Sequence, residues 1–129
     1  MTRFQTTFGM LILAQAAHCI EEYAGRLWTT FPPAQYLTGL ISQDRRLGFI
    51  AVNVTFIVFG IWCFLWPVRK NWTLAIGLAW FWAVLELVNG TTHVLWSFLQ
   101  QGYTAGSATA PVLLVLAFYL ARLNLAAKR

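Results

Sequence analysis

Acidic residues are scarce in this chain and fewer than the basic ones. Its 129 residues include four Asp and Glu against nine Lys and Arg, and charged residues make up only 10% of the total. In an ordinary soluble domain about a quarter of the residues are charged. Since 59% of the residues are hydrophobic, this shortage of charge excludes a soluble globular domain and indicates an integral membrane protein.

Cysteine is scarcer still, with two residues. Cys19 and Cys63 both lie in apolar segments, and their spacing is typical of neither a metal site nor a disulfide framework. The net charge of +5 is spread over helix ends and loops rather than gathered in one basic patch. This distribution fits membrane topology and contact with membrane lipid, so we expect no nucleic-acid partner.

The length of the chain allows about four membrane helices of roughly 20 residues each. We therefore predict an all-α fold, a single four-helix transmembrane bundle over residues 1–129, with spans at about 4–27, 47–66, 72–98 and 108–123.

Two segments lie at the edges of this pattern of spans: Ala14-Gln15-Ala16 near the N-terminus and the stretch that follows the double proline. Ala14-Gln15-Ala16 resembles a signal-peptide cleavage site, but the apolar run continues past it, so a retained first span is favoured. The double proline at 32–33 should end any helix, and residues 34–43 should form a short interfacial helix between the first and second spans.

The basic residues predict the orientation of this multi-pass bundle. Six Lys and Arg would lie on one side of the membrane and three on the other. The six are Arg3, Arg69, Lys70, Arg122, Lys128 and Arg129, and the three are Arg26, Arg45 and Arg46. Because cytoplasmic loops carry the excess of positive charge, we expect both termini in the cytoplasm.

Three of the four acids and both histidines fall within predicted spans. They are His18, Glu21 and Glu22 in the first span, and Glu86 and His93 in the third. A charged side chain facing lipid at mid-membrane costs about 2.5 to 3.5 kcal/mol. These side chains should therefore point into the bundle.

Helical geometry places the two polar groups level with each other. The first and third spans run in the same direction, and at about 1.5 Å per residue Asn89 and His93 lie at the depths of His18 and Glu22. Within each span the polar residues share one face, so we expect His18 and Glu22 within joint coordination or hydrogen-bonding reach of His93.

A ridge of small residues runs beside the polar face of the third span. It consists of Ala75, Ala79, Ala83 and Gly90. Small residues at this spacing allow membrane helices to approach closely, which should bring the two polar faces together. The same ridge also favours a homo-oligomer.

Imidazoles combined with carboxylates at i, i+3 and i+4 are the ligands used for zinc, iron or manganese. The predicted ligands of one metal ion or a bridged pair are His18, Glu22, His93 and Glu86. Glu21 or Glu86 would then be the general base. Supporting or substrate-lining positions are assigned to Asn89, Asn53, Trp82 and Arg26.

Two other interpretations of the polar residues remain open. One is a buried network in which His18 pairs with Glu22, Glu22 with Arg26 at i+4, and His93 with Asn89. The other is a metal-free acid and base pair that uses a proton held on Glu86.

Three functions follow from these interpretations. The first is a metal-dependent enzyme that hydrolyses or oxidises a lipid-like or isoprenoid-like substrate entering sideways from the bilayer. The second is a small transporter or a protein that binds protons or cations through the same carboxylates. The third is a structural or accessory subunit of a larger membrane complex.

The motif H-x-x-E-E at His18, Glu21 and Glu22, with N-x-x-x-H at Asn89 and His93, resembles the HXXEE family of small multi-span membrane proteins. The resemblance implies an enzymatic membrane protein whose site is formed by these residues. It implies neither a substrate nor a particular metal, and Glu86 is added to the site on spacing alone.

Overall fold

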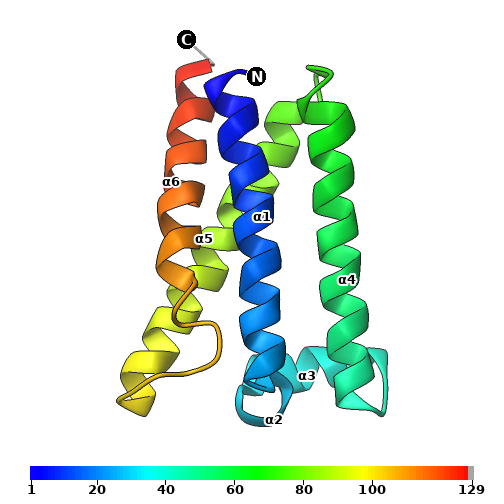
Figure 1. The fold of residues 1–129 in the computed structure, drawn as a ribbon, viewed down its shortest axis with the longest axis vertical. Coiled ribbons are helices and arrows are strands. Elements are labelled where there is room, and N and C mark those ends of the chain that lie inside the picture. The colour runs from blue at the N-terminus through cyan, green and yellow to red at the C-terminus, as the bar shows by residue number, and fades with distance from the viewer. Residues whose placement is uncertain (128–129) are drawn as a thin grey trace.

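The helices of this chain stand side by side in a bundle in the computed structural model, which describes residues 1–127 (Figure 1). Within this range the chain forms six α-helices and one π-helical turn, η1, and contains no strand, so the predicted all-α class is confirmed. The elements are α1 (Arg3–Ala24), α2 (Leu27–Thr30), α3 (Pro32–Ile41), α4 (Arg45–Cys63), η1 (Phe64–Val68), α5 (Ala75–Gln100) and α6 (Ala110–Ala127).

Short connections join α4 through η1 to α5 and α5 to α6, whereas α2 and α3 lie between α1 and α4. Both ends of the described chain lie at one end of the bundle, and α2 and α3 close the opposite end (Figure 1). Lys128 and Arg129, which were counted on the basic side of the predicted topology, lie outside the described residues.

Local sequence signals explain where several helices begin. Thr2 and Gln5 form a capping box at the start of α1, and the Asp44 carboxylate accepts hydrogen bonds from two backbone N–H groups in the first turn of α4. The double proline does more than end a helix. Pro32 and Pro33 occupy the first turn of α3, where a missing N–H leaves no hydrogen bond unmade.

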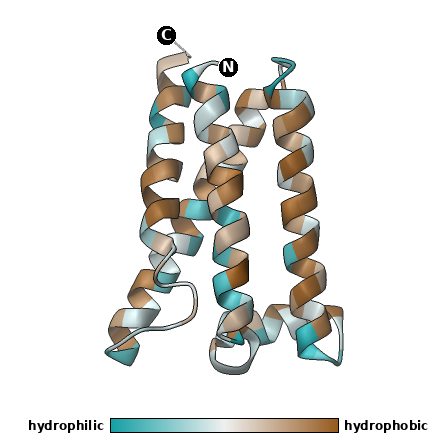
Figure 2. Cartoon of the chain, in the orientation of Figure 1, coloured by the Kyte–Doolittle hydropathy of each residue, from teal (hydrophilic) through white to brown (hydrophobic). Residues whose placement is uncertain are grey.

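Two of the described helices are long and apolar enough to cross a membrane, whereas four were predicted. They are α4 continued through η1 (Arg45–Val68) and α6, and both are coloured mainly as hydrophobic in Figure 2. The other two long helices carry the polar residues singled out in the sequence, and these lower their hydropathy. Beyond its first turn, α1 has its hydrophilic turns in the half next to α2 (Figure 2).

The small-residue ridge of α5 is buried as expected, but its closest helix contact is with α6. A Cβ placed on Gly90 would lie 2.8 Å from Cγ of Leu114 and 3.1 Å from the backbone oxygen of Ala110. Glycine therefore allows α5 and α6 to touch at this point. The α1 and α5 helices meet instead through polar side chains, described below.

Replacing Gly90 with valine should destabilise the bundle by about 1–3 kcal/mol, because the added carbons force α5 and α6 apart. The matched control is Gly77→Val, also in α5, where an added Cβ meets no atom within 4 Å. Thermal unfolding in detergent should show a lower midpoint for the first variant only. Equal midpoints for the two variants would contradict the proposed contact.

Candidate functional site

His18, Glu22 and His93 converge at the centre of a buried cluster that joins α1 to α5. Glu22 Oε1 lies 3.1 Å from Nε2 of His18, one turn away on α1, and 2.9 Å from Nε2 of His93 on α5. One potential ligand atom from each residue lies within 4.8 Å of the other two, so this group could hold a metal ion. The proximity expected from the helical geometry is present.

The cluster is shielded from solvent. Both histidine side chains are at most 1% exposed, and their rings meet edge to face with centroids 4.7 Å apart. Phe31, which precedes α3, stacks on His93 at 5.3 Å. Charge in such a dry setting interacts more strongly than at the surface and is costly unless it is paired.

Glu21 lies on the other flank of α1 and holds the beginning of α6. Its carboxylate accepts hydrogen bonds from the backbone N–H groups of Ala108 (3.2 Å) and Thr109 (2.9 Å), and from the hydroxyls of Thr109 (2.7 Å) and Tyr103 (2.6 Å). Negative charge is favourable where the N–H groups of a helix start are free. Both carboxylate oxygens are thus engaged in positioning α6.

Thr109 connects this helix start to the cluster. Its hydroxyl oxygen lies 2.6 Å from Nδ1 of His18, while its single hydrogen is directed to the Glu21 carboxylate. A carboxylate only accepts hydrogen bonds, so Thr109 must accept from His18. Nδ1 of His18 therefore carries a proton, and in the neutral ring Nε2 presents a lone pair towards Glu22.

The connection between α5 and α6 contributes Tyr103 to this arrangement. The hydrogen bond from its hydroxyl to Glu21, together with the negative charge of that group, raises the pKa of Tyr103. Tyr103 consequently stays a neutral donor at physiological pH and keeps one oxygen of Glu21 occupied.

Gly106, in the same connection, lies directly against both imidazoles. Its φ of +92° is in the region that favours glycine, and a Cβ there would lie 2.6 Å from Nδ1 of His93 and 2.9 Å from Cε1 of His18. No hydrogen bond reaches Nδ1 of His93 within the described residues. The close approach of bare backbone thus sets the position of the two rings.

Glu86 belongs to a second buried polar group, which lies to one side of the cluster of His18, Glu22 and His93. Its Oε2 accepts a hydrogen bond from Nδ2 of Asn89 at 3.2 Å, and with its amide nitrogen turned towards Glu86, Gln15 on α1 donates at 2.9 and 3.2 Å. Glu86 is not one of the three clustered ligand residues, although it was predicted among the ligands. Asn89 pairs with Glu86, rather than with His93 as the network interpretation predicted.

A cavity of about 340 Å³ adjoins both polar groups. Glu22, His93, Glu86 and Asn89 contribute to its wall, and most of the remaining lining is apolar and comes from α3, α4 and α5. Its mouth lies at the surface, because the lining residue Val88 is 62% exposed. Pockets of about 300 to 1,000 Å³ with a few convergent polar groups are typical of small-molecule sites.

The other predicted site residues are distributed around this centre. Asn53 lines the cavity and accepts a hydrogen bond from the buried Cys19 thiol at 2.8 Å, so it links α4 to α1. Trp82 lies in the core against Phe59 and is not part of the cavity wall. The predicted pair of Arg26 with Glu22 is absent, because Glu22 faces the histidines.

Five residues in contact with the predicted site residues were not assigned to the site from the sequence. They are Gln15, Phe31, Tyr103, Gly106 and Thr109. Gln15 falls on the polar face of α1, three residues before His18, and this position was an available signal. Neither Gly106 nor Thr109 carries a comparable signal, since their role depends on how the connection folds back over α1.

The Gly106→Ala substitution should displace the two imidazoles and cost about 2–4 kcal/mol, from the left-handed backbone and the added contact. The chain has only two histidines, so two Cε1–H signals in the NMR spectrum report the change directly. The control is Gly102→Ala, where the added Cβ meets nothing within 4 Å. Unshifted histidine signals in Gly106→Ala would refute the contact.

Comparison with known proteins identifies one relationship. The family described as "Protein of unknown function with HXXEE motif" matches residues 9–120 of the chain. No curated protein and no solved structure matches. The matched region includes His18, Glu21, Glu22 and His93, and it covers most of the sequence. The chain therefore belongs to the HXXEE family.

Proposed function

We propose that this protein is a metal-dependent membrane enzyme that acts on a lipid-like substrate. One observation supports the proposal above all: three ligand atoms from His18, Glu22 and His93 converge beside an apolar cavity, and two of these residues also line it. A metal ion held there would be in contact with whatever occupies the cavity.

The hydrogen bonding of His18 favours a cation at the cluster. Nε2 of His18 is buried and lies 3.1 Å from Glu22 Oε1. In the neutral ring, with Nδ1 protonated towards Thr109, Nε2 and the carboxylate both offer lone pairs that a cation between them would accept, whereas in the imidazolium Nε2 would donate to Glu22. A divalent zinc, iron or manganese ion accepts this donor set of two imidazoles and one carboxylate.

Three protein ligands suit catalysis better than a purely structural metal. Structural zinc sites are closed by four ligands, whereas catalytic sites keep a position for water or substrate. A metal in such a site supplies a nucleophilic water for hydrolysis or, when it is iron, supports oxidation. Only His18, Glu22 and His93 form such a ligand group among residues 1–127, which favours one metal ion over a bridged pair.

Glu86 is the better candidate for the general base. Its carboxylate lines the cavity, whereas both oxygens of Glu21 are occupied by donors at the start of α6. Gln15 and Asn89 hold Glu86 in place through their amides. In hydrolysis Glu86 would take the proton from the attacking water.

The walls of the cavity define the substrate class. Leu37 of α3 and Val88 of α5 line it and are each more than half exposed, so an apolar surface leads into it. An alkyl or isoprenoid chain would lie along these walls, with its polar end near Glu22 and His93. Such a substrate would enter sideways from the membrane.

The proposal includes a bundle of four membrane-spanning helices with both termini in the cytoplasm. The α1 and α5 helices have 22 and 26 residues, long enough to span, and their polar side chains face inward. Their outer surfaces are apolar, as Leu13 and Ile20 on α1 and Leu95 on α5 illustrate. The excess of Lys and Arg near the termini supports the orientation.

Elemental analysis of the purified protein should find a stoichiometric transition metal. His18→Ala and His93→Ala should each lower its content at least about tenfold, because each removes a ligand. Glu86→Gln is the matched control and should retain the metal. Absence of metal from the wild type would refute the enzyme, and carboxylate-dependent cation flux in liposomes would then identify a transporter.

The Glu86→Gln variant should lose about 10²- to 10⁴-fold in turnover of fluorogenic fatty-acyl esters while its metal content is unchanged. Amide and carboxyl groups have the same shape, so the cavity is preserved. The control is Asp44→Asn. It makes the same carboxylate-to-amide change at the N-cap of α4, outside the cavity. Wild-type turnover in Glu86→Gln would exclude Glu86 as the base.

A further inference from the structure

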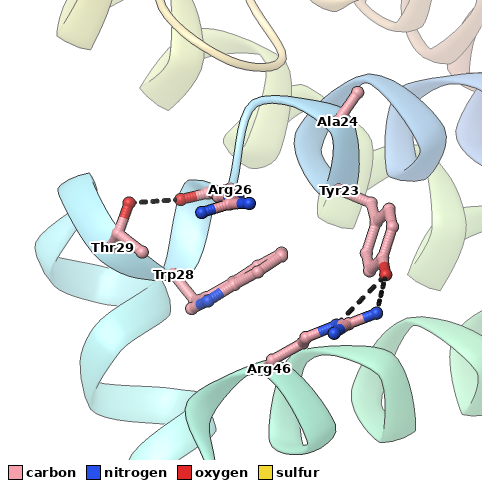
Figure 3. Close-up of a pocket in the computed structure, with 6 residues that line it drawn as sticks. All are labelled: Tyr23, Ala24, Arg26, Trp28, Thr29 and Arg46. Atoms are coloured by element: carbon pink, nitrogen blue, oxygen red, sulfur yellow. Dashed lines mark hydrogen bonds between the residues drawn. The ribbon is translucent and has the colours of Figure 1, made fainter.

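A second pocket lies outside the proposed active site, at the end of the bundle closed by α2. It has a volume of about 380 Å³ and is lined by Tyr23, Ala24, Arg26, Trp28, Thr29 and Arg46 (Figure 3). None of these residues lines the apolar cavity beside the histidines. The guanidinium groups of Arg26 and Arg46 come from different elements, and the Trp28 indole lies between them in Figure 3.

Tyr23 fixes one of the two arginines. Its hydroxyl oxygen accepts hydrogen bonds from Nε (3.2 Å) and Nη2 (2.7 Å) of Arg46, and the guanidinium lies 5.7 Å from the centre of the phenol ring. The Tyr23 hydroxyl still has its own hydrogen to donate. An ordered arginine of this kind loses less side-chain entropy when it binds a ligand.

Arg26 occupies a backbone position that glycine or asparagine would adopt more readily. Its φ is 51°, in the left-handed region, and its carbonyl oxygen accepts hydrogen bonds from the Thr29 N–H (2.9 Å) and hydroxyl (2.7 Å). A left-handed residue is common just after a helix, and here it turns the chain from α1 into α2. The turn places the Arg26 side chain at the wall of the pocket.

The pocket is rich in donors and contains no carboxylate. Neither Arg26 nor Arg46 forms an ion pair with any residue in the described part of the chain. The side-chain oxygens available are the hydroxyls of Tyr23 and Thr29, and that of Thr29 is already directed to a carbonyl. Two uncompensated guanidinium groups around one hollow attract an anion.

We propose that this pocket binds a phosphate group, presented by a membrane lipid or by a free phosphate ion. Arginine matches phosphate oxygens with paired N–H donors, and the Tyr23 hydroxyl adds a neutral donor. The neighbouring α3 exposes Tyr36, Leu40 and Ile41, an apolar surface suited to the membrane interface. The site requires neither the metal nor the reaction proposed above.

Binding is tested with the full chain in detergent and with Arg26→Asn and Arg46→Gln. Asparagine adopts the left-handed backbone readily, so the first variant removes the charge without added strain. Calorimetric titration with sodium phosphate tests the free ion. Mass spectrometry of lipid retained after exposure to vesicles of equal phosphatidylcholine and phosphatidylglycerol tests the lipid headgroup.

At least one probe should bind the wild type, and each variant should weaken that binding about tenfold or more, as expected for loss of charge-assisted hydrogen bonds. The matched control is Arg45→Gln, which removes the same charge from a neighbouring exposed residue outside the pocket. Tyr23→Phe should weaken binding less, with no change in charge.

The two probes separate the sources of the phosphate. Selective retention of phosphatidylglycerol identifies the lipid headgroup, and a response to sodium phosphate alone identifies the free ion. The proposal is overturned if neither probe distinguishes the wild type from Arg26→Asn and Arg46→Gln. It is also overturned if Arg45→Gln reduces binding as much as they do, since that result indicates general electrostatic attraction.

Discussion

The carboxylate of Glu22 between two imidazoles is the interaction on which the surrounding structure depends. A carboxylate buried among apolar helices is stable only when paired, and Glu22 has its partners on α1 and α5 at 3.1 and 2.9 Å. The chain then holds those partners in place. The hydrogen bond with Thr109 fixes the orientation of the His18 ring, and Gly106 allows the backbone to pack against both rings.

The scarcity of acidic residues has a structural counterpart, because each of the four has a distinct position. Asp44 caps α4, Glu21 holds the start of α6, Glu22 joins the histidines, and Glu86 faces the apolar cavity. The arginines near α2 have no such partners within the described residues. Three of the four carboxylates thus contact other helices within the bundle or the connections between them, whereas Arg26 and Arg46 line the pocket at its end.

Helical periodicity was sufficient to predict the all-α fold and the meeting of His18, Glu22 and His93. It works because two parallel helices place residues at depths set by a fixed rise per residue. It could not predict that Gly90 packs on α6, or that Glu21 turns towards Ala108 and Thr109. Those outcomes depend on the path of the connection after α5, where no periodic pattern constrains the chain.

The hydrogen bond that Thr109 donates to Glu21 and the one that it accepts from His18 have a consequence for biosynthesis. The first helix is made long before residue 109 leaves the ribosome, so Glu21 and His18 must wait for the last helix to supply their partner. Arrival of α6 therefore completes the site, and a chain truncated before residue 109 would leave one carboxylate, Glu21, and one imidazole, His18, without these contacts. The cluster of His18, Glu22 and His93 can therefore be completed only after the chain has been synthesised as far as the start of α6.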